Sequence, residues 1–438
     1  MKFTKFGKAL VLSALSTTVV LGITSCVQSY TVGFLYVTGT VTAQSSSAGI
    51  ISGFRIDHNT GKLTPIDKLP VSSGGANPVR AVLLTGSKFL YVLNRGVTAS
   101  GGSDCTTADP CQNSNITVFA VGGNGILTPQ ETFYTQGSNP FRIVADGSGN
   151  YLYVLDHDAP SSSACALALG GGASACGDIT AFQVNQTTGR LQLIVNAQVT
   201  SASGAALPYF PVPANPIDFV EVSSTFLTLS GTPASGDAVF PYSFSATSGQ
   251  LTINQNSTQP LGVSQATAIV SAGGFIYVLD NEQITVNGIL SYSQILPYSV
   301  GSNGALQAQT GGIVPDDPTL SNPIYLITES KGKFLYVANQ GNNTSTTNSQ
   351  SGIAGYVIDP NQHTLSFIAG QPFGSGAGPQ CIVEDPSDQF IYEADFNDSS
   401  VTGRVVDPNS GVLNNLRVTN TYSVQGPATW CLVDGRTS

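Results

Sequence analysis

Three charged residues occupy the same position in a recurring segment that is otherwise apolar. Arg80 stands in NPVRAV, Arg142 in NPFRIV and Asp218 in NPIDFV. An unpaired charge is costly to bury, so these side chains either face a polar space or pair with charges of neighbouring repeats. In a polar space, Arg80 or Arg142 would bind an anion or polarise a carbonyl group, and Asp218 would accept a proton. The other copies place Ala268, Tyr325, Cys381 and Thr429 at this position, and Tyr325 is a further binding candidate.

A second set of polar residues ends a strongly apolar segment that follows each of these copies. Its members are Asn94, Asp156, Asp280, Asn339 and Asp395, with His157 directly after Asp156. Long polar loops follow at residues 95–114, 157–177 and 340–350, and binding sites are often built on such loops. All six residues are therefore binding candidates, and His157 is also a catalytic candidate. No motif requires a cofactor; clusters such as Asp156-His157-Asp158 fit Ca²⁺, but also the capping of turns by side chains.

These residues belong to a repeat that runs through the chain. Its most visible part is an apolar strand with an aromatic core, which begins at Phe34, Phe89, Tyr151, Phe226, Phe275, Phe334 and Phe390. A second strand follows each copy and turns through a short polar hairpin into a third. The hairpins read TGKL, NGIL, TGRL, SGQL, NGAL, QHTL and SGVL, and only the sixth lacks the glycine that favours such a turn.

The segments that open with Asn-Pro or Gly-Pro supply the remaining strand of each unit. The last copy begins at Gly426 with no aromatic strand after it, whereas the aromatic strand at Phe34 has no such segment before it. Four strands per unit, seven units and this offset predict an all-β, seven-bladed β-propeller of antiparallel four-stranded blades. The C-terminal strand would complete the N-terminal blade, so that residues 33–438 form one closed domain without exposed sheet edges.

The N-terminal residues predict export. Lys2, Lys5 and Lys8 precede an uncharged apolar run from about Ala9 to Ile23, which is too short to span a membrane. The run ends in Ile23-Thr24-Ser25-Cys26, a lipobox-like sequence. We therefore expect residues 1–25 to be a lipoprotein signal peptide, Cys26 to carry the lipid, and residues 26–32 to link it to the propeller at a cell or outer membrane. The alternative is an ordinary secretory signal.

Charge and cysteine content fit an exported protein. The formal net charge is −10, and loss of the three signal-peptide lysines makes it −13, which disfavours nucleic acids as partners. Six cysteines remain after Cys26, and an even number in an exported chain indicates disulfides. Cys105 with Cys111 and Cys165 with Cys176 would each close a short loop, while Cys381 and Cys431 lie in equivalent segments of neighbouring repeats. We expect a monomer.

Together, the Gly-x-x-Pro strand, the Phe-Leu-Tyr-Val strand and the Thr-Gly-x-Leu hairpin resemble the lactonase family of seven-bladed propellers. This family includes propeller-type 6-phosphogluconolactonases and carboxymuconate cyclases. The resemblance implies hydrolysis of a lactone. Its enzymatic members typically have histidine directly after the proline of the innermost strand, but the matching residues here are Val79, Phe141, Ile217, Ile324, Gln380 and Ala428.

Two functions follow from these observations. The resemblance implies a lactonase-like hydrolase that acts on a lactone or sugar acid outside the cytoplasm, with Arg80, Arg142 and Asp218 as its catalytic residues. The missing histidines and the polar loops instead favour a non-catalytic propeller that binds a surface protein or glycan. An open channel with unpaired charges would support the enzyme, and a plugged channel with bridged charges would support the scaffold.

Overall fold

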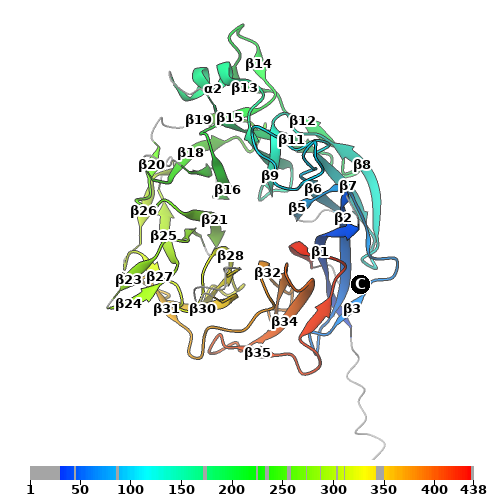
Figure 1. Cartoon of the computed structure of the whole chain (residues 1–438), viewed down its shortest axis with the longest axis vertical. Coiled ribbons are helices and arrows are strands. Elements are labelled where there is room, and N and C mark those ends of the chain that lie inside the picture. Colours follow the sequence, from blue (N-terminus) through cyan, green and yellow to red (C-terminus); the bar gives the residue numbers. More distant parts are fainter. Residues whose placement is uncertain are drawn as a thin grey trace, which may run out of the picture. The chain divides into compact units, whose positions relative to one another are not determined.

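The computed structural model describes residues 30–435, except 44–45, 85–87, 171–174, 223–224, 232–235, 254–257, 273, 287, 302–303, 310 and 342–349. The predicted signal peptide and Cys26 lie outside this range. Within it, no helix is long and apolar enough to cross a membrane. From Thr31 onward the chain forms one compact unit, a ring of seven antiparallel blades over the described residues (Figure 1).

Each blade is a sheet whose first strand lines the channel, as predicted. From the channel outward, blade 1 contains β37 (Ala428–Asp434), β1 (Thr31–Ala43), β2 (Ser46–Asp57) and β3 (Leu63–Pro65). Blade 2 contains β5 (Pro78–Leu83), β6 (Phe89–Asn94), β7 (Asn115–Val121) and β8 (Leu127–Phe133). Blade 3 contains β9 (Ser138–Ala145), β10 (Tyr151–Asp158), β11 (Gly177–Val184) and β12 (Leu191–Leu193). Blade 4 contains β16 (Pro216–Val222), β17 (Thr225–Ser230), β18 (Ala238–Phe244) and β19 (Leu251–Ile253).

The remaining blades follow the same order. Blade 5 contains β21 (Ala266–Ala272), β22 (Phe275–Asp280), β25 (Gln294–Val300) and β26 (Leu306–Ala308). Blade 6 contains β28 (Pro323–Thr328), β29 (Phe334–Asn339), β30 (Gly352–Ile358) and β31 (Leu365–Phe367). Blade 7 contains β32 (Pro379–Glu384), β33 (Phe390–Asp395), β34 (Ser400–Val406) and β35 (Leu413–Asn415).

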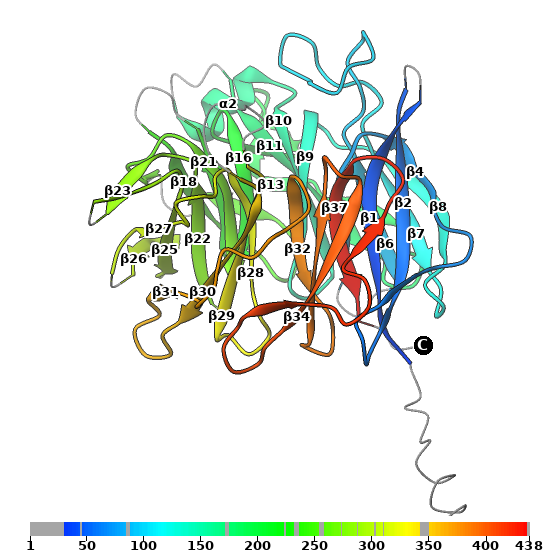
Figure 2. The ribbon, with the colours of Figure 1, turned by 60° about the horizontal axis from the view of Figure 1, so that its bottom comes forward.

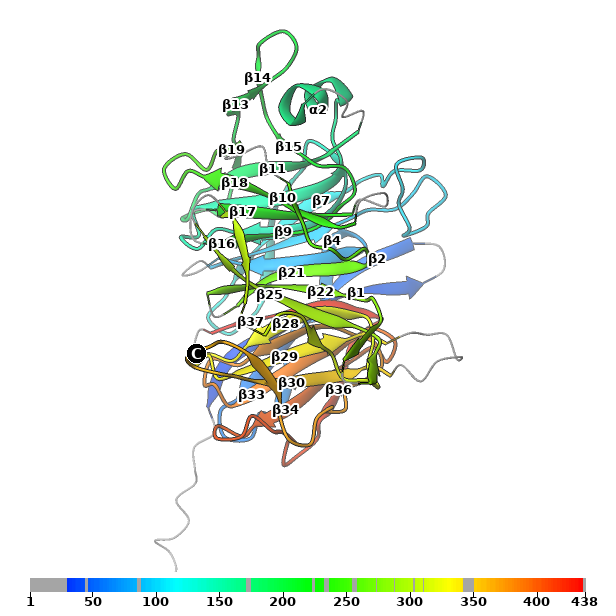
Figure 3. The ribbon, with the colours of Figure 1, turned by 90° about the vertical axis from the view of Figure 1, so that its left-hand side faces the viewer.

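Several short elements add to this plan. In five blades a second outer segment pairs with the third strand: β4 (Val71–Ala76), β15 (Phe210–Val212), β20 (Gln259–Pro260), β27 (Val314–Pro315) and β36 (Thr421–Ser423). Hairpins are formed by β13 (Asn196–Thr200) with β14 (Ala206–Leu207) and by β23 (Ile284–Val286) with β24 (Ile289–Ser291). Helix α2 (Ser162–Leu169) and the β13–β14 hairpin project beyond the rim of blade 3 (Figure 3).

The ring closes as the sequence predicts. Strand β37 pairs antiparallel with β1, so the last strand of the chain is the innermost strand of the first blade. The innermost strands of neighbouring blades contact one another all the way round the ring.

In five blades the aromatic strand is hydrogen-bonded to the hairpin of the next blade. Tyr91 of blade 2 donates a hydrogen bond to the carbonyl oxygen of the hairpin residue Gly189 in blade 3, at 3.0 Å. A Cβ atom on Gly189 would lie 2.5 Å from the ring of Phe89, and the backbone φ is +73°, so the position requires glycine. Tyr36, Tyr153, Tyr336 and Tyr392 make the same bond to Gly125, Gly249, Gly411 and Gly61. The family-like motifs are therefore contacts between blades.

The Gly-x-x-Pro motif also has a structural cause. The asparagines before the prolines, Asn77, Asn139, Asn215 and Asn322, have φ between +49° and +59°, and Gly378 and Gly426 replace them with φ of +71° and +74°. Asparagine and glycine tolerate this conformation best. At the first glycine, Gly137, a Cβ atom would lie 2.6 Å from the Cβ of Asp156, so only glycine lets the loop pass over the end of β10.

Candidate functional site

Every innermost strand carries a bulge near the upper end of the channel. The strand register shifts between Pro78 and Arg80 in blade 2 and at the matching place in the other blades. A bulge of this kind redirects a side chain and is common beside functional sites. We call the residues directly after it the upper ring: Arg80, Arg142, Asp218, Ala268, Tyr325, Cys381 and Trp430.

In blade 1 the structure shifts the sequence alignment of the innermost strands by one residue. In blade 7, Pro379 pairs with Asp395 and Cys381 with Ala394. In blade 1, the two residues of β1 that are equivalent to Asp395 and Ala394 pair with Ala428 and Trp430. Ala428 therefore takes the place of the proline, and Trp430, not Thr429, belongs to the upper ring. The residue in the place of the family histidine is likewise Thr429 and not Ala428.

The channel encloses a cavity of about 590 Å³ below the mouth. Arg80, Arg142, Asp218, Tyr325 and Trp430 of the upper ring line it. The structure therefore brings the three predicted catalytic residues and the binding candidate Tyr325 together. The size is within the range of small-molecule sites.

Arg142 and Asp218 pair with each other across blades 3 and 4. The Arg142 Nε atom donates to Asp218 Oδ1 at 3.0 Å. Asp218 also accepts backbone N–H groups, from Phe219 on Oδ1 at 2.9 Å and from Ile269 on Oδ2 at 3.3 Å. For this arginine the ion-pair alternative is correct, and these hydrogen bonds fix the orientation of the Asp218 carboxylate.

Arg80 has aromatic partners in place of a carboxylate. Its guanidinium carbon lies 3.6 Å from the centroid of the Trp430 ring and 5.5 Å from that of Tyr325. Trp430 is fixed by its indole N–H, which donates to the Ala81 carbonyl at 3.1 Å, and its ring meets Tyr325 edge-on at 4.9 Å. Tyr325 of blade 6 reaches Trp430 of blade 1 because blade 7 places only the short Cys381 between them.

The charge of Arg80 is left without a close counter-ion. No ion pair of Arg80 occurs within the described part of the chain. Burial and the nearby charge of Arg142 lower the pKa of Arg80 to about 9, although Asp218 acts in the opposite direction. The group stays protonated at neutral pH, so an anion in the cavity would relieve an existing electrostatic cost.

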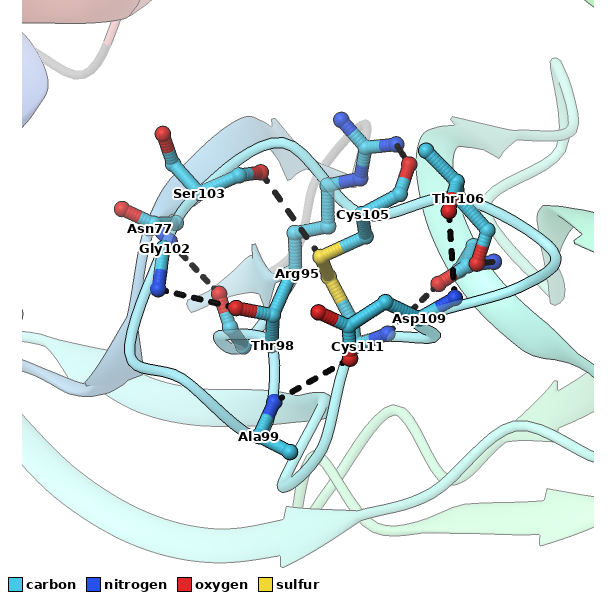
Figure 4. Close-up of a disulfide and its surroundings, with 12 residues drawn as sticks. Asn77, Arg95, Thr98, Ala99, Gly102, Ser103, Cys105, Thr106, Asp109 and Cys111 are labelled. Carbon is cyan, nitrogen blue, oxygen red and sulfur yellow. Dashed lines mark hydrogen bonds between the residues drawn. A yellow bond between two sulfur atoms is a disulfide. The ribbon is translucent and has the colours of Figure 1, made fainter.

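A third arginine, which the sequence reasoning missed, adds to this charge. Arg95 directly follows Asn94 and opens the 95–114 loop, where its Nη2 atom donates to the Cys105 carbonyl at 3.3 Å (Figure 4). Burial and Arg142 lower the pKa of Arg95. Its Nε atom is buried without a hydrogen-bond partner among the described residues. Arg95 does not line the cavity, but its positive charge is near enough to Arg142 to act on it, which favours anions on this side of the ring.

The predicted binding residues at the ends of the second strands lie inside the blades. Asn94, Asp156, Asp280, Asn339 and Asp395 are all 0% exposed. Asp156 accepts a hydrogen bond from Thr135 at 2.8 Å, Asp280 from Gln294 at 2.8 Å and Asp395 from Thr402 at 2.8 Å. Asn94 donates to the Asn115 side chain at 2.9 Å. These contacts cap the blades, and ligand binding by this set stays a prediction.

Blade 3 buries two acids that face each other on adjacent strands. Asp156 and Asp178 are cross-strand partners, both 0% exposed, and Asp178 Oδ1 has no hydrogen-bond partner among the described residues. Burial raises the pKa of Asp156 to about 8. Burial and the neighbouring Asp156 raise the pKa of Asp178 well above its ordinary value.

His157 lies outside the cavity. Its Nδ1 atom is 3.1 Å from Asp158 Oδ1, and its ring is 6.4 Å from that of Phe141. A catalytic role for it stays a prediction, as does calcium binding. Over the described residues, no three His, Cys, Asp or Glu side chains converge as metal ligands would.

All three predicted disulfides are confirmed. Cys105 bonds to Cys111, Cys165 to Cys176 and Cys381 to Cys431, with Cα atoms 5.1, 5.7 and 5.8 Å apart. The first two staple the loops that rise on the same face of the ring (Figure 2). The third joins β32 to β37, directly beside Trp430. Disulfides of this kind fit an oxidising, extracytoplasmic compartment.

The comparisons with known proteins fit this geometry. A sequence model of the family described as "Lactonase, 7-bladed beta-propeller" matches residues 33–207. The predicted resemblance to this family is confirmed. Among curated proteins nothing matches this chain significantly.

Three solved structures have the same fold. The match to a putative 6-phosphogluconolactonase of Bacteroides fragilis has a TM-score of 0.61 at 16% identity and covers 92% of this chain and 98% of that one. The periplasmic gluconolactonase of Pseudomonas aeruginosa gives the same four values. For a putative 6-phosphogluconolactonase of Bacteroides uniformis the TM-score is 0.62 at 16% identity, with 92% and 100% of the two chains covered. Identities this low establish the fold alone.

Proposed function

We propose that this lactonase-type propeller binds an anionic lactone, or the hydroxy acid derived from it, in its central channel and hydrolyses the lactone there. The observation that carries this proposal is Arg80. Arg80 lines the cavity, its guanidinium group lies against Trp430 and Tyr325, and it has no carboxylate partner in the described residues. A carboxylate group of the ligand, or its polarised carbonyl oxygen, would be the negative partner that Arg80 lacks.

The hydrolytic step can be assigned to residues of the upper ring. Arg80 stabilises the negative charge that develops on the carbonyl oxygen when water attacks the carbonyl carbon. Asp218, oriented by Arg142, accepts the proton from that water. The ring C–O bond then breaks, and the proton passes to the leaving alkoxide, which gives a hydroxy acid.

A second function, binding without catalysis, is favoured by the surroundings of Asp218. Its oxygens already accept hydrogen bonds from Arg142 Nε and from two backbone N–H groups, so fewer lone pairs are left to orient an attacking water molecule. The disulfide-stapled loops on the same face would then present a surface for a protein or glycan partner, and the channel would hold only a small anion.

The test uses the single tryptophan of the sequence as a probe, since Trp430 lies within the site. Titration with gluconate and glucono-δ-lactone should change its fluorescence, and Arg80→Met should weaken binding about 10- to 100-fold through loss of a charge-assisted hydrogen bond. Lactone hydrolysis, followed with a pH indicator, should fall in Asp218→Asn while binding persists. Binding without turnover would support the second function, and equal affinity in Arg80→Met would contradict both.

We also propose that Cys26 anchors the propeller to a membrane through lipid. The support is the lipobox-like sequence that ends at this residue, together with the disulfides of the propeller. The full chain expressed in bacteria should partition with membranes, and Cys26→Ser should release it. Mass spectrometry of the N-terminal peptide should find the lipid on Cys26. An unmodified Cys26 on a released wild-type chain would indicate an ordinary secretory signal.

A further inference from the structure

Directly below the upper ring, all seven innermost strands carry a branched aliphatic residue. Side chains two residues apart share one face of a strand, so this level lies about 6.6 Å further along the channel. All seven residues line the cavity: Val82, Val144, Val220, Val270, Ile327, Val383 and Leu432. We call this level the aliphatic collar.

The collar differs sharply from the ring above it. The upper ring contains two arginines, an aspartate, a tyrosine and a tryptophan, whereas the collar has no hydrogen-bonding side chain in any blade. The next level is again mixed: Leu83, Ala145, Ser271, Glu384 and Val433 line the cavity there. The cavity is therefore polar at its upper end and apolar around its waist, and carboxyl groups line it again further down, at Glu384 and Asp146.

This order of polar and apolar levels along the cavity restricts the chemistry of the ligand. A hydroxyl group placed at the collar loses its hydrogen bonds to water and finds no partner on the wall, whereas a methylene group gains from leaving water. From this we infer that the ligand carries an aliphatic chain beside its anionic or lactone head. The substrate class is then an alkyl-substituted lactone or its hydroxy acid, and polyhydroxylated sugar acids are disfavoured. This inference rests on the proposed binding of the head by Arg80.

Glu384 sets the lower limit of the apolar stretch. Its Oε2 atom accepts the Ser330 backbone N–H at 2.8 Å, and its Oε1 atom is buried without a partner among the described residues. The affinity gained by lengthening the chain should therefore stop once the chain reaches this level.

Hexanoate and gluconate form a matched pair for the test, because they have the same number of carbons and the same charge and differ in hydroxyl groups. We expect hexanoate to bind more tightly, measured by calorimetry and by Trp430 fluorescence. Along the series butanoate, pentanoate and hexanoate, each methylene group in the collar should tighten binding about fourfold.

Val220→Thr with Val270→Thr keeps the size of two collar residues and adds two hydroxyl groups. This double variant should shrink the preference for hexanoate over gluconate, and the exposed Val418→Thr should leave it unchanged. Gluconate binding as tightly as hexanoate, still abolished by Arg80→Met, would overturn the collar proposal and leave the proposed function intact. Absence of binding by every carboxylate would overturn both.

Discussion

Removal of the Cys381–Cys431 disulfide, by replacing both residues with alanine, is expected to cost the folded state about 4 kcal/mol, because the bond closes a loop of about 50 residues. The effect should be visible as a lower midpoint of thermal and denaturant unfolding. Both cysteines are nearly inaccessible, at 0% and 2% exposed, and alanine leaves little extra space. The bond also ties β37 to β32, so its loss weakens the attachment of the strand that closes the ring.

The Cys105–Cys111 disulfide provides the matched control. It spans only 6 residues, and the same relation gives a cost of about 2 kcal/mol for its removal. It closes a turn within the 95–114 loop and does not touch the strand that carries Trp430. Ligand binding at Trp430 should therefore change less than in the Cys381–Cys431 variant. Equal unfolding midpoints of the two double variants would contradict a special role of the third disulfide in ring closure.

The blade architecture could be predicted from sequence because each repeat obeys local rules. The strand at Phe89, the hairpin at Gly189 and the proline at Pro78 each need a particular residue type for a contact that recurs in most blades. Such contacts leave the same pattern wherever they occur. Cysteine spacing was informative for a similar reason, since short loops bring their ends together.

The site was only partly predictable, because it depends on geometry that the pattern does not encode. Trp430 was missed since blade 1 takes up its bulge one residue later than the alignment of prolines implies. Charge alone also gave no indication of which arginine pairs. Arg142 and Asp218 lie on neighbouring blades in the right register, whereas Arg80 meets Trp430 of blade 1, a partner that only ring closure brings near it.

The second large effect concerns the buried acids of blade 3. Replacement of Asp178 by Asn should stabilise the protein increasingly as pH rises. In the wild type, the raised pKa values of Asp156, to about 8, and of Asp178 mean that the folded state keeps protons that the unfolded chain releases near the ordinary value of 3.8. The stability that Asp156 contributes is complete below about pH 4 and is lost as pH rises through about 8, and the contribution of Asp178 is lost in the same direction.

Blade 2 supports this substitution and supplies its control, because Asn115 occupies the position of Asp178 there and accepts a hydrogen bond from Asn94. For one proton, the difference in unfolding free energy between Asp178→Asn and the wild type should grow by roughly 1.4 kcal/mol per pH unit within that window. Denaturant unfolding of both proteins at pH 4, 6 and 8 measures this difference. For Asn115→Asp the change in unfolding free energy with pH should have the opposite sign, since this variant buries an acid where the wild type has an amide. A difference that stays constant with pH would mean that the two carboxyl groups of blade 3 ionise as freely in the folded state as in the unfolded chain.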